Sequence, residues 1–242
     1  MTPTSLAGET GARRVTPALF VVVIACFFLT FSGVSCNTTA TKTALQSLAG
    51  SSGVSTSQTA VLDTCLNALK DVNVLTYSGW GLVAGRDPSI ASLPTACDTG
   101  TSLNARDASQ VNLGPQLLAI LALISAALGL LWALAGLFGI VRARTRAVAA
   151  IIFGVASAAQ LLLDQQRIHD LVLARIAASA GSTIPAFRPA SYFNVNPGIG
   201  LVIAVVLLAV AVLYNLAALI LGEGGASDTV AAPPEGPTTI PP

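Results

Sequence analysis

Residues Pro115–Val141, PQLLAILALISAALGLLWALAGLFGIV, decide the fold class, because they contain no charged side chain. At 1.5 Å per residue, a helix of this length exceeds the hydrocarbon core of a bilayer, which is about 30 Å thick. Three further apolar runs accompany it, at Pro17–Ser35, Ala147–Leu163 and Gly198–Leu221. The sequence therefore predicts an all-α membrane protein, a bundle of four transmembrane helices.

The third run, Ala147–Leu163, is shorter than the others and begins directly after Arg146. It continues past Asp164 into a polar and then amphipathic stretch, which predicts one long helix that tilts or rises out of the membrane. A re-entrant or interfacial helix is the alternative at this length.

The composition agrees with a membrane protein, since 53% of the residues are hydrophobic, 10% are charged and the net charge is +1. A soluble core does not need so many apolar residues. There is no basic face for nucleic acid, so the lipid bilayer is the expected partner.

Positive charge in the short loops predicts the orientation, because such loops favour the cytoplasmic side. Arg13 and Arg14 precede the first run, and three arginines fill the tight connection 142–146. We therefore expect a plasma-membrane protein with both termini in the cytoplasm. The predicted segments, from the cytoplasmic N-terminal tail to the disordered C-terminal tail, are 1–16, 17–35, 36–114, 115–141, 142–146, 147–163, 164–197, 198–221 and 222–242. Of these, 36–114 and 164–197 are extracytoplasmic.

The first run could instead be a cleaved signal peptide. Arg13 and Arg14 would form its positive region, and Gly33–Ser35 offers small residues for cleavage before Cys36. The apolar run is longer than the core of a typical signal peptide, which favours an uncleaved anchor. Cleavage would leave a membrane sensor with three spans.

Three of the four cysteines, Cys36, Cys65 and Cys97, fall in the outer segment, where an oxidising exterior favours a disulfide. They allow one bridge, and the sequence does not choose among the three pairings. A bridge from Cys65 to Cys97 would close a loop of about thirty residues. A bridge to Cys36 would instead tie the outer domain to the end of the first helix.

The outer segment 36–114 is predicted to be a small, partly helical domain. Apolar residues recur at helical spacing over Gln58–Lys70, and Val72–Tyr77 favours an extended piece. Ser78 could cap a brief helix that closes at Gly85. The best candidates for a contact surface are Tyr77, Trp80 and Leu82, although burial within the domain is the competing interpretation.

Two motifs carry a resemblance. Phe27–Cys36, FFLTFSGVSC, ends the first run, and Thr76–Gly85, TYSGWGLVAG, follows in the outer segment. Together they resemble a group of uncharacterised bacterial four-span membrane proteins in which the first helix ends in Val-Ser-Cys. That group has no assigned activity to carry over. The order of spans and loops also resembles that of claudin-like proteins, although Gly79–Leu82 departs from their Gly-Leu-Trp arrangement and the cysteine spacing differs.

The spans lack the ionisable groups that transporters and redox carriers place at membrane depth, so a small-solute transporter or channel subunit is the alternative rather than the main hypothesis. No Gly-x-Ser-x-Gly or His-Glu-x-x-His motif occurs, and the single histidine, His169, has no Cys-x-x-Cys beside it. We therefore expect no enzyme activity, no metal and no cofactor.

Small residues suit the second run to close helix packing, because Ser125, Gly129 and Ala133 recur every four residues. Packing within the bundle is the first interpretation, and formation of a homo-oligomer is the other. The predicted function is that of a structural or accessory component that acts through its outer domain, with a membrane-protein partner.

Overall fold

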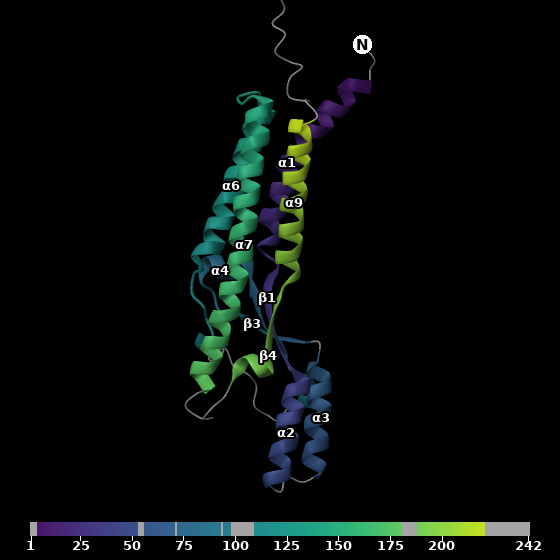
Figure 1. Cartoon of the computed structure of the whole chain (residues 1–242), viewed down its shortest axis with the longest axis vertical. Coiled ribbons are helices and arrows are strands. Elements are labelled where there is room, and N and C mark those ends of the chain that lie inside the picture. The colour runs from purple at the N-terminus through teal and green to yellow at the C-terminus, as the bar shows by residue number, and fades with distance from the viewer. Residues whose placement is uncertain are drawn as a thin grey trace, which may run out of the picture.

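The computed structural model describes residues 4–52, 56–70, 72–92, 94–97, 109–180 and 188–220. It is mostly helical. Four helices lie side by side as a bundle in the upper part of Figure 1: α1 (Thr4–Cys26), α6 (Leu117–Leu137), α7 (Ala143–Ala180) and α9 (Ile199–Ile220). The start of α1, the α6–α7 connection and the end of α9 lie at one end of this bundle, which we call the inner end.

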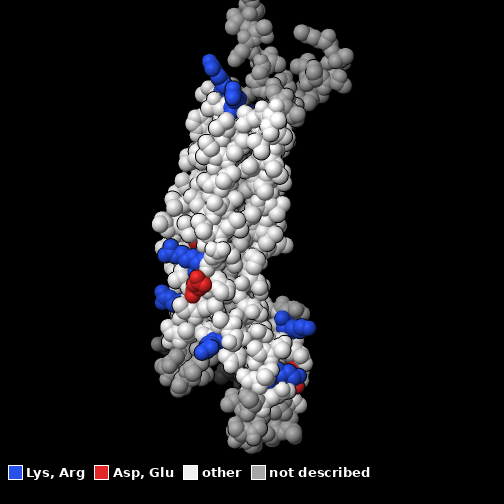
Figure 2. All heavy atoms as spheres, in the orientation of Figure 1, with Lys and Arg blue, Asp and Glu red and all other residues white. Residues whose placement is uncertain are grey.

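Among the described residues, three helices are long and apolar enough to cross a membrane, over Leu117–Leu137, Arg144–Ala178 and Ile199–Ile220. The apolar part of α1 is shorter, Val15–Cys26. Figure 2 shows a broad face without charged side chains, bounded by basic residues at the inner end and by mixed charges farther down. We call this region the uncharged belt.

The third run and the amphipathic stretch after it form one continuous helix, α7, of 38 residues. The prediction of a single long helix is therefore confirmed. Its uncharged part, between Arg146 and Asp164, is about 26 Å long at 1.5 Å per residue. The rest of α7 continues beyond the uncharged belt beside the outer part of the molecule, as Figure 1 shows.

The expectation of an all-α protein is wrong, because a four-stranded antiparallel sheet lies below the bundle. The first run does not stay helical to Ser35. Helix α1 ends at Cys26, and the amide of Leu29 donates to the carbonyl of Cys26 over 2.9 Å in a tight turn. The next residues, Thr30–Cys36, form strand β1.

The sheet joins the two outer segments of the chain. Its order is β3-β2-β1-β4, and its other strands are β2 (Asn73–Ser78), β3 (Ser89–Ile90) and β4 (Phe193–Pro197). Strand β1 follows α1 directly, and β4 leads into α9, so both edges of the β1–β4 pair continue into membrane-type helices. In their register Val34 lies opposite Val195. The sheet is therefore connected to the bundle twice, through β1 to α1 and through β4 to α9.

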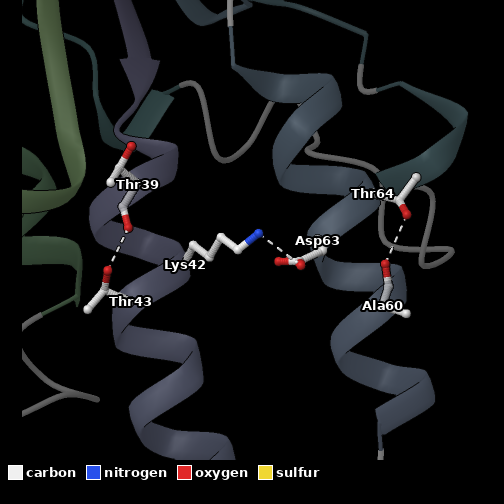
Figure 3. Close-up of polar contacts among 6 residues, drawn as sticks. All are labelled: Thr39, Lys42, Thr43, Ala60, Asp63 and Thr64. Carbon is white, nitrogen blue, oxygen red and sulfur yellow. Dashed lines mark hydrogen bonds and ion pairs between the residues drawn. The ribbon is translucent and has the colours of Figure 1, made fainter.

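Two helices, α2 (Thr38–Ser52) and α3 (Thr56–Leu69), form a hairpin that projects away from the bundle at the bottom of Figure 1. The ammonium group of Lys42 lies 3.0 Å from a carboxylate oxygen of Asp63 and links the two helices (Figure 3). Both side chains are more than two-fifths exposed, so this ion pair adds little stability. The hairpin is the part of the molecule farthest from the inner end.

The remaining outer elements are short: α4 (Gly79–Ala84), the 3-10 turn η1 (Thr95–Cys97) and α8 (Pro189–Tyr192). The predicted cap of α4 is confirmed, because the Ser78 hydroxyl accepts a hydrogen bond from the amide of Gly81 over 3.0 Å. Gly85 ends α4 with φ 66°, a left-handed conformation that favours glycine. The predicted disordered tail 222–242 lies outside the described residues.

Candidate functional site

Among the described acidic and basic residues of the bundle, Asp164 on α7 is the one that is buried, at 1% exposure. Its Oδ1 atom has no hydrogen-bond partner in the part of the chain that the structure describes. The oppositely charged Arg167, three residues along the same helix, is exposed. Because burial of a carboxyl group without a partner is unfavourable, Asp164 is the polar group in this bundle that most needs a functional explanation.

Asp164 lies near the outer end of the bundle, at the level where α9 begins. Gly154 on α7 sits against α9, since a Cβ atom there would lie 2.8 Å from Cγ2 of Val212. From Gly154 to Asp164 is about 15 Å along α7. The same distance back along the antiparallel α9 leads from Val212 almost to its first residue, Ile199. The carboxyl group therefore lies at the boundary between bundle and sheet.

A second buried polar atom without a partner among the described residues belongs to this boundary. This atom is the hydroxyl oxygen of Ser32 on β1, which is fully buried and forms no hydrogen bond with any described residue. Ser32 lies opposite Pro197, and the neighbouring amide of Gly198 donates to the carbonyl of Phe31 over 2.7 Å. Chemically, each of these two groups can form a hydrogen bond to a buried water molecule.

Elsewhere in the bundle, polar side chains have partners in neighbouring helices. The Ser157 hydroxyl donates to the carbonyl of Ala122 over 3.0 Å, which ties α7 to α6. The Ser125 hydroxyl donates to the Gln160 side-chain oxygen over 3.1 Å between the same two helices. These pairs fit a packing role.

The predicted packing residues Ser125, Gly129 and Ala133 all lie on α6. Gly129 and Ala133 are buried, and Ser125 is half-buried. A Cβ atom on Gly129 would lie 2.6 Å from the ring of Phe20 on α1, so the missing side chain allows close approach of these helices. This placement is consistent with packing inside the bundle.

Of the three candidate disulfide cysteines, the structure joins Cys65 and Cys97. The bridge ties α3 to η1. Cys36, at the end of β1, is a half-buried free thiol, and burial raises its pKa. Cys26, at the end of α1, is free and buried.

Of the three candidate contact residues, two are buried, which favours for them the competing interpretation of burial within the domain. Tyr77 is 3% exposed, its hydroxyl donates to the carbonyl of Val111 over 2.9 Å, and burial raises its pKa to about 12. Leu82 is also buried. Both belong to the buried core of the molecule, and α4 contacts α6. Trp80 alone is exposed, and its ring stacks on that of Phe28 at a centroid distance of 5.8 Å.

Sequence reasoning missed Asp164, Ser32 and Phe28 as notable residues. Asp164 was treated as the first residue of an outer segment, because a linear sequence does not show that this face of α7 turns inward. Its spacing from Leu161 and Ile168, both buried, places it on the apolar stripe of the helix. That periodicity was the available signal.

Comparisons with protein families, curated proteins and solved structures found no match to this chain.

In the part of the chain that the structure describes, no three histidine, cysteine or acidic residues gather closely enough to hold a metal ion.

Proposed function

We propose that this chain is a four-span plasma-membrane protein with both termini in the cytoplasm, and that it serves as a structural or accessory component. The arginines at the inner end, Arg142, Arg144 and Arg146, support this orientation through the positive-inside tendency. The start of α1 and the end of α9 lie at this same end of the bundle, which is consistent with the orientation (Figure 1).

The packing of α1 supports its assignment as a span. Phe20 and Val23 are fully buried where α1 contacts α6 and α9. On its other face Val21 and Val22 are 53% and 46% exposed, as expected for side chains that meet lipid. Removal of α1 as a signal peptide would uncover the inner face of the bundle, so this packing favours an uncleaved anchor over the three-span sensor.

The single observation that carries the accessory role is the sheet, to which both outer segments contribute. Because β1 and β4 continue into α1 and α9, the sheet holds the outer domain in a fixed position on the bundle. The Cys65–Cys97 bridge closes this domain further. A rigid outer domain on a membrane anchor is well suited to holding a neighbouring membrane protein.

The α2–α3 hairpin is the proposed working surface, because it projects farthest from the bundle (Figure 1) and Tyr77 and Leu82 are buried. Val61 on α3 is 61% exposed there. The test is to delete the gene and compare intact membrane complexes on native gels. We expect at least one complex to lose assembly or abundance, and the wild-type chain to restore it.

A matched pair of variants locates the surface. Val61→Arg on the hairpin should fail to restore the complex, whereas Asp170→Arg, which changes an exposed residue on α7, should restore it. If all complexes are unchanged after deletion, the accessory role is wrong.

Buried Asp164 specifically favours a second candidate, a small-solute transporter or channel subunit, because ionisable side chains within membrane bundles commonly mark ion or proton pathways. Purified protein in liposomes would then carry a proton or cation flux that Asp164→Asn abolishes. Absence of flux across an imposed ion gradient would reject this candidate.

A further inference from the structure

An exposed aromatic pair, Phe28 and Trp80, lies where the bundle meets the sheet. Phe28 follows the end of α1 and is 68% exposed, and Trp80 on α4 is 38% exposed. Their rings stack with an angle of 20° between the planes. Exposed apolar patches commonly mark a site of contact with another protein or with a membrane.

Backbone hydrogen bonds hold the two rings in place. The amide of Trp80 donates to the carbonyl of Phe27 over 2.6 Å, and the amide of Gly79 donates to the carbonyl of Leu29 over 3.2 Å. A Cβ atom on Gly79 would lie 2.9 Å from the ring of Phe31, so α4 sits tightly on the chain that leaves α1. The pair is therefore a preorganised surface.

The pair lies at the outer edge of the uncharged belt. The amide of Gln116, which caps α6, donates to the carbonyl of Leu82 on α4 over 2.8 Å, so α4 is level with the start of α6. The first residue of α6, Leu117, is 61% exposed, and the first residue of α9, Ile199, is 66% exposed. Exposed apolar side chains thus lie at the outer ends of both α6 and α9.

The second tryptophan of the chain lies toward the other edge. Trp132 is 38% exposed on α6, about 22 Å along that helix from Leu117. Tryptophan is enriched at both interfaces of a membrane, where its ring meets the headgroups. Trp80 is thus level with the outer end of α6, and Trp132 lies in the inner half of this helix, about 8 Å along it from Leu137.

We propose that Phe28 and Trp80 form an anchor that inserts into the boundary between headgroups and acyl chains of the outer leaflet, so that lipid, rather than a protein partner, covers this surface. The proposal rests on the membrane placement in the proposed function, not on its accessory role. The surface is continuous with the lipid-facing side of α1, and no charged side chain occurs in the described stretches 27–41 and 72–85.

The test uses the two tryptophans of the chain as probes. The full-length Trp132→Phe protein, which keeps Trp80 alone, is reconstituted in phosphatidylcholine vesicles. Its emission is compared in lipid without bromine, lipid brominated near the headgroup and lipid brominated near the chain end. We expect Trp80 to lose most of its emission with bromine near the headgroup and little with bromine near the chain end.

Two Phe→Ala changes in the Trp132→Phe background test the pair itself. Phe28→Ala should weaken the quenching by headgroup-near bromine, because the stacked ring no longer holds the indole in the boundary. Phe138→Ala, which removes a ring 78% exposed at the far end of α6, should leave the quenching unchanged.

The Trp80→Phe protein, which keeps Trp132, separates the possible failures. Quenching of Trp132 without quenching of Trp80 would overturn the anchor and leave the membrane placement standing, as for a surface reserved for a protein partner. Absence of quenching for both would overturn the anchor and the membrane placement together. Quenching of Trp80 with unchanged membrane complexes after gene deletion would support the anchor and reject only the accessory role.

Discussion

Asn215 on α9 donates a hydrogen bond from Nδ2 to Oγ1 of Thr16 on α1 over 3.2 Å, near the inner end of the bundle. Both side chains are buried, at 3% and 2% exposure. The same amide group donates to the carbonyl of Ala211 over 2.7 Å within α9. A residue from the first helix is thus tied to the last helix, 199 positions away in the chain.

We expect Asn215→Leu to lower the free energy of unfolding by about 0.5–2 kcal/mol, because interhelical hydrogen bonds in membrane bundles contribute in this range and Thr16 loses its partner. A titration from mild detergent into SDS measures the change. Leu213→Ala, at an exposed position on α9, is the control and should have a smaller effect. The double variant Thr16→Val/Asn215→Leu should recover part of the loss; equal stability of Asn215→Leu and wild type would contradict the prediction.

Gly129→Ala should destabilise the bundle by about 1–3 kcal/mol, since the new methyl group would overlap the fully buried ring of Phe20. In an exposed helix the same change would be stabilising. The sign of the effect therefore reports the α1–α6 contact. Adding Phe20→Leu to Gly129→Ala should restore part of the stability in a double-mutant cycle. Additive effects would mean that the two residues do not touch.

The long helices could be predicted from the sequence because their apolar runs are uninterrupted over enough residues to span a bilayer. The strand Thr30–Cys36 could not. It follows α1 without a polar break, and hydrophobicity alone does not separate a buried strand from the last turns of an apolar helix. Its alternative signal was local, since Thr30 and Val34 are β-branched and Gly33 disfavours a helix.

The candidate site was harder to predict than the helices. Pairing of β1 with β4 brings together residues such as Ser35 and Asn196, which are 161 positions apart, and no local pattern encodes such a contact. The inward position of Asp164 has a local signal in its spacing from Leu161 and Ile168, but it also depends on how α7 is rotated in the bundle. Tyr77 and Trp80 lie close in sequence, yet one is buried and the other exposed because the chain changes from β2 to α4 between them.

Loss of the Cys65–Cys97 bridge should destabilise the outer domain while the bundle stays folded. The bridge spans 32 residues, for which the chain-entropy relation gives about 3.7 kcal/mol. In the Cys97→Ser protein, limited proteolysis in mild detergent should cut the α2–α3 hairpin faster than in wild type. The Cys36→Ser protein, which lacks a free thiol instead, should behave as wild type. In the wild-type protein, measurement of the intact mass after alkylation should show two cysteines that react only after a reductant is added.

Tyr77 should make stability fall at alkaline pH. Burial raises its pKa to about 12 from an ordinary value of 10.0, so the folded chain keeps the phenol proton over a range in which the unfolded chain releases it. The stabilisation is complete below about pH 10 and is lost as the pH rises toward about 12. Phenolate absorbance of the folded protein should therefore contain a component near pH 12.

The Tyr77→Phe protein is the control for this titration. It should lack that component, because the Tyr77 phenol group is absent. It should also show a weaker fall in stability over the same pH range, although at neutral pH it lacks the hydrogen bond to Val111 and should be about 1 kcal/mol less stable. Loss of a component near pH 10 instead of near pH 12 in the Tyr77→Phe protein would show that Tyr77 is accessible to solvent.

Replacing Asp164 distinguishes a functional carboxyl group from a merely tolerated one. Asp164→Leu removes a buried acidic group whose Oδ1 has no partner among the described residues, so it should raise the free energy of unfolding by at least about 1 kcal/mol. Asp170→Leu, at an exposed position on the same helix, should change it little. The measurement is the same titration into SDS.

The outcome shows what the carboxyl group does. If Asp164→Leu is more stable than wild type but loses the proton or cation flux, the carboxyl group is kept for transport although its burial is unfavourable. A loss of stability would instead mean that the carboxyl group has a stabilising partner, such as a bound water molecule or backbone amide groups at the start of α6 or α9. Asp164 would then have a structural role at the boundary between bundle and sheet.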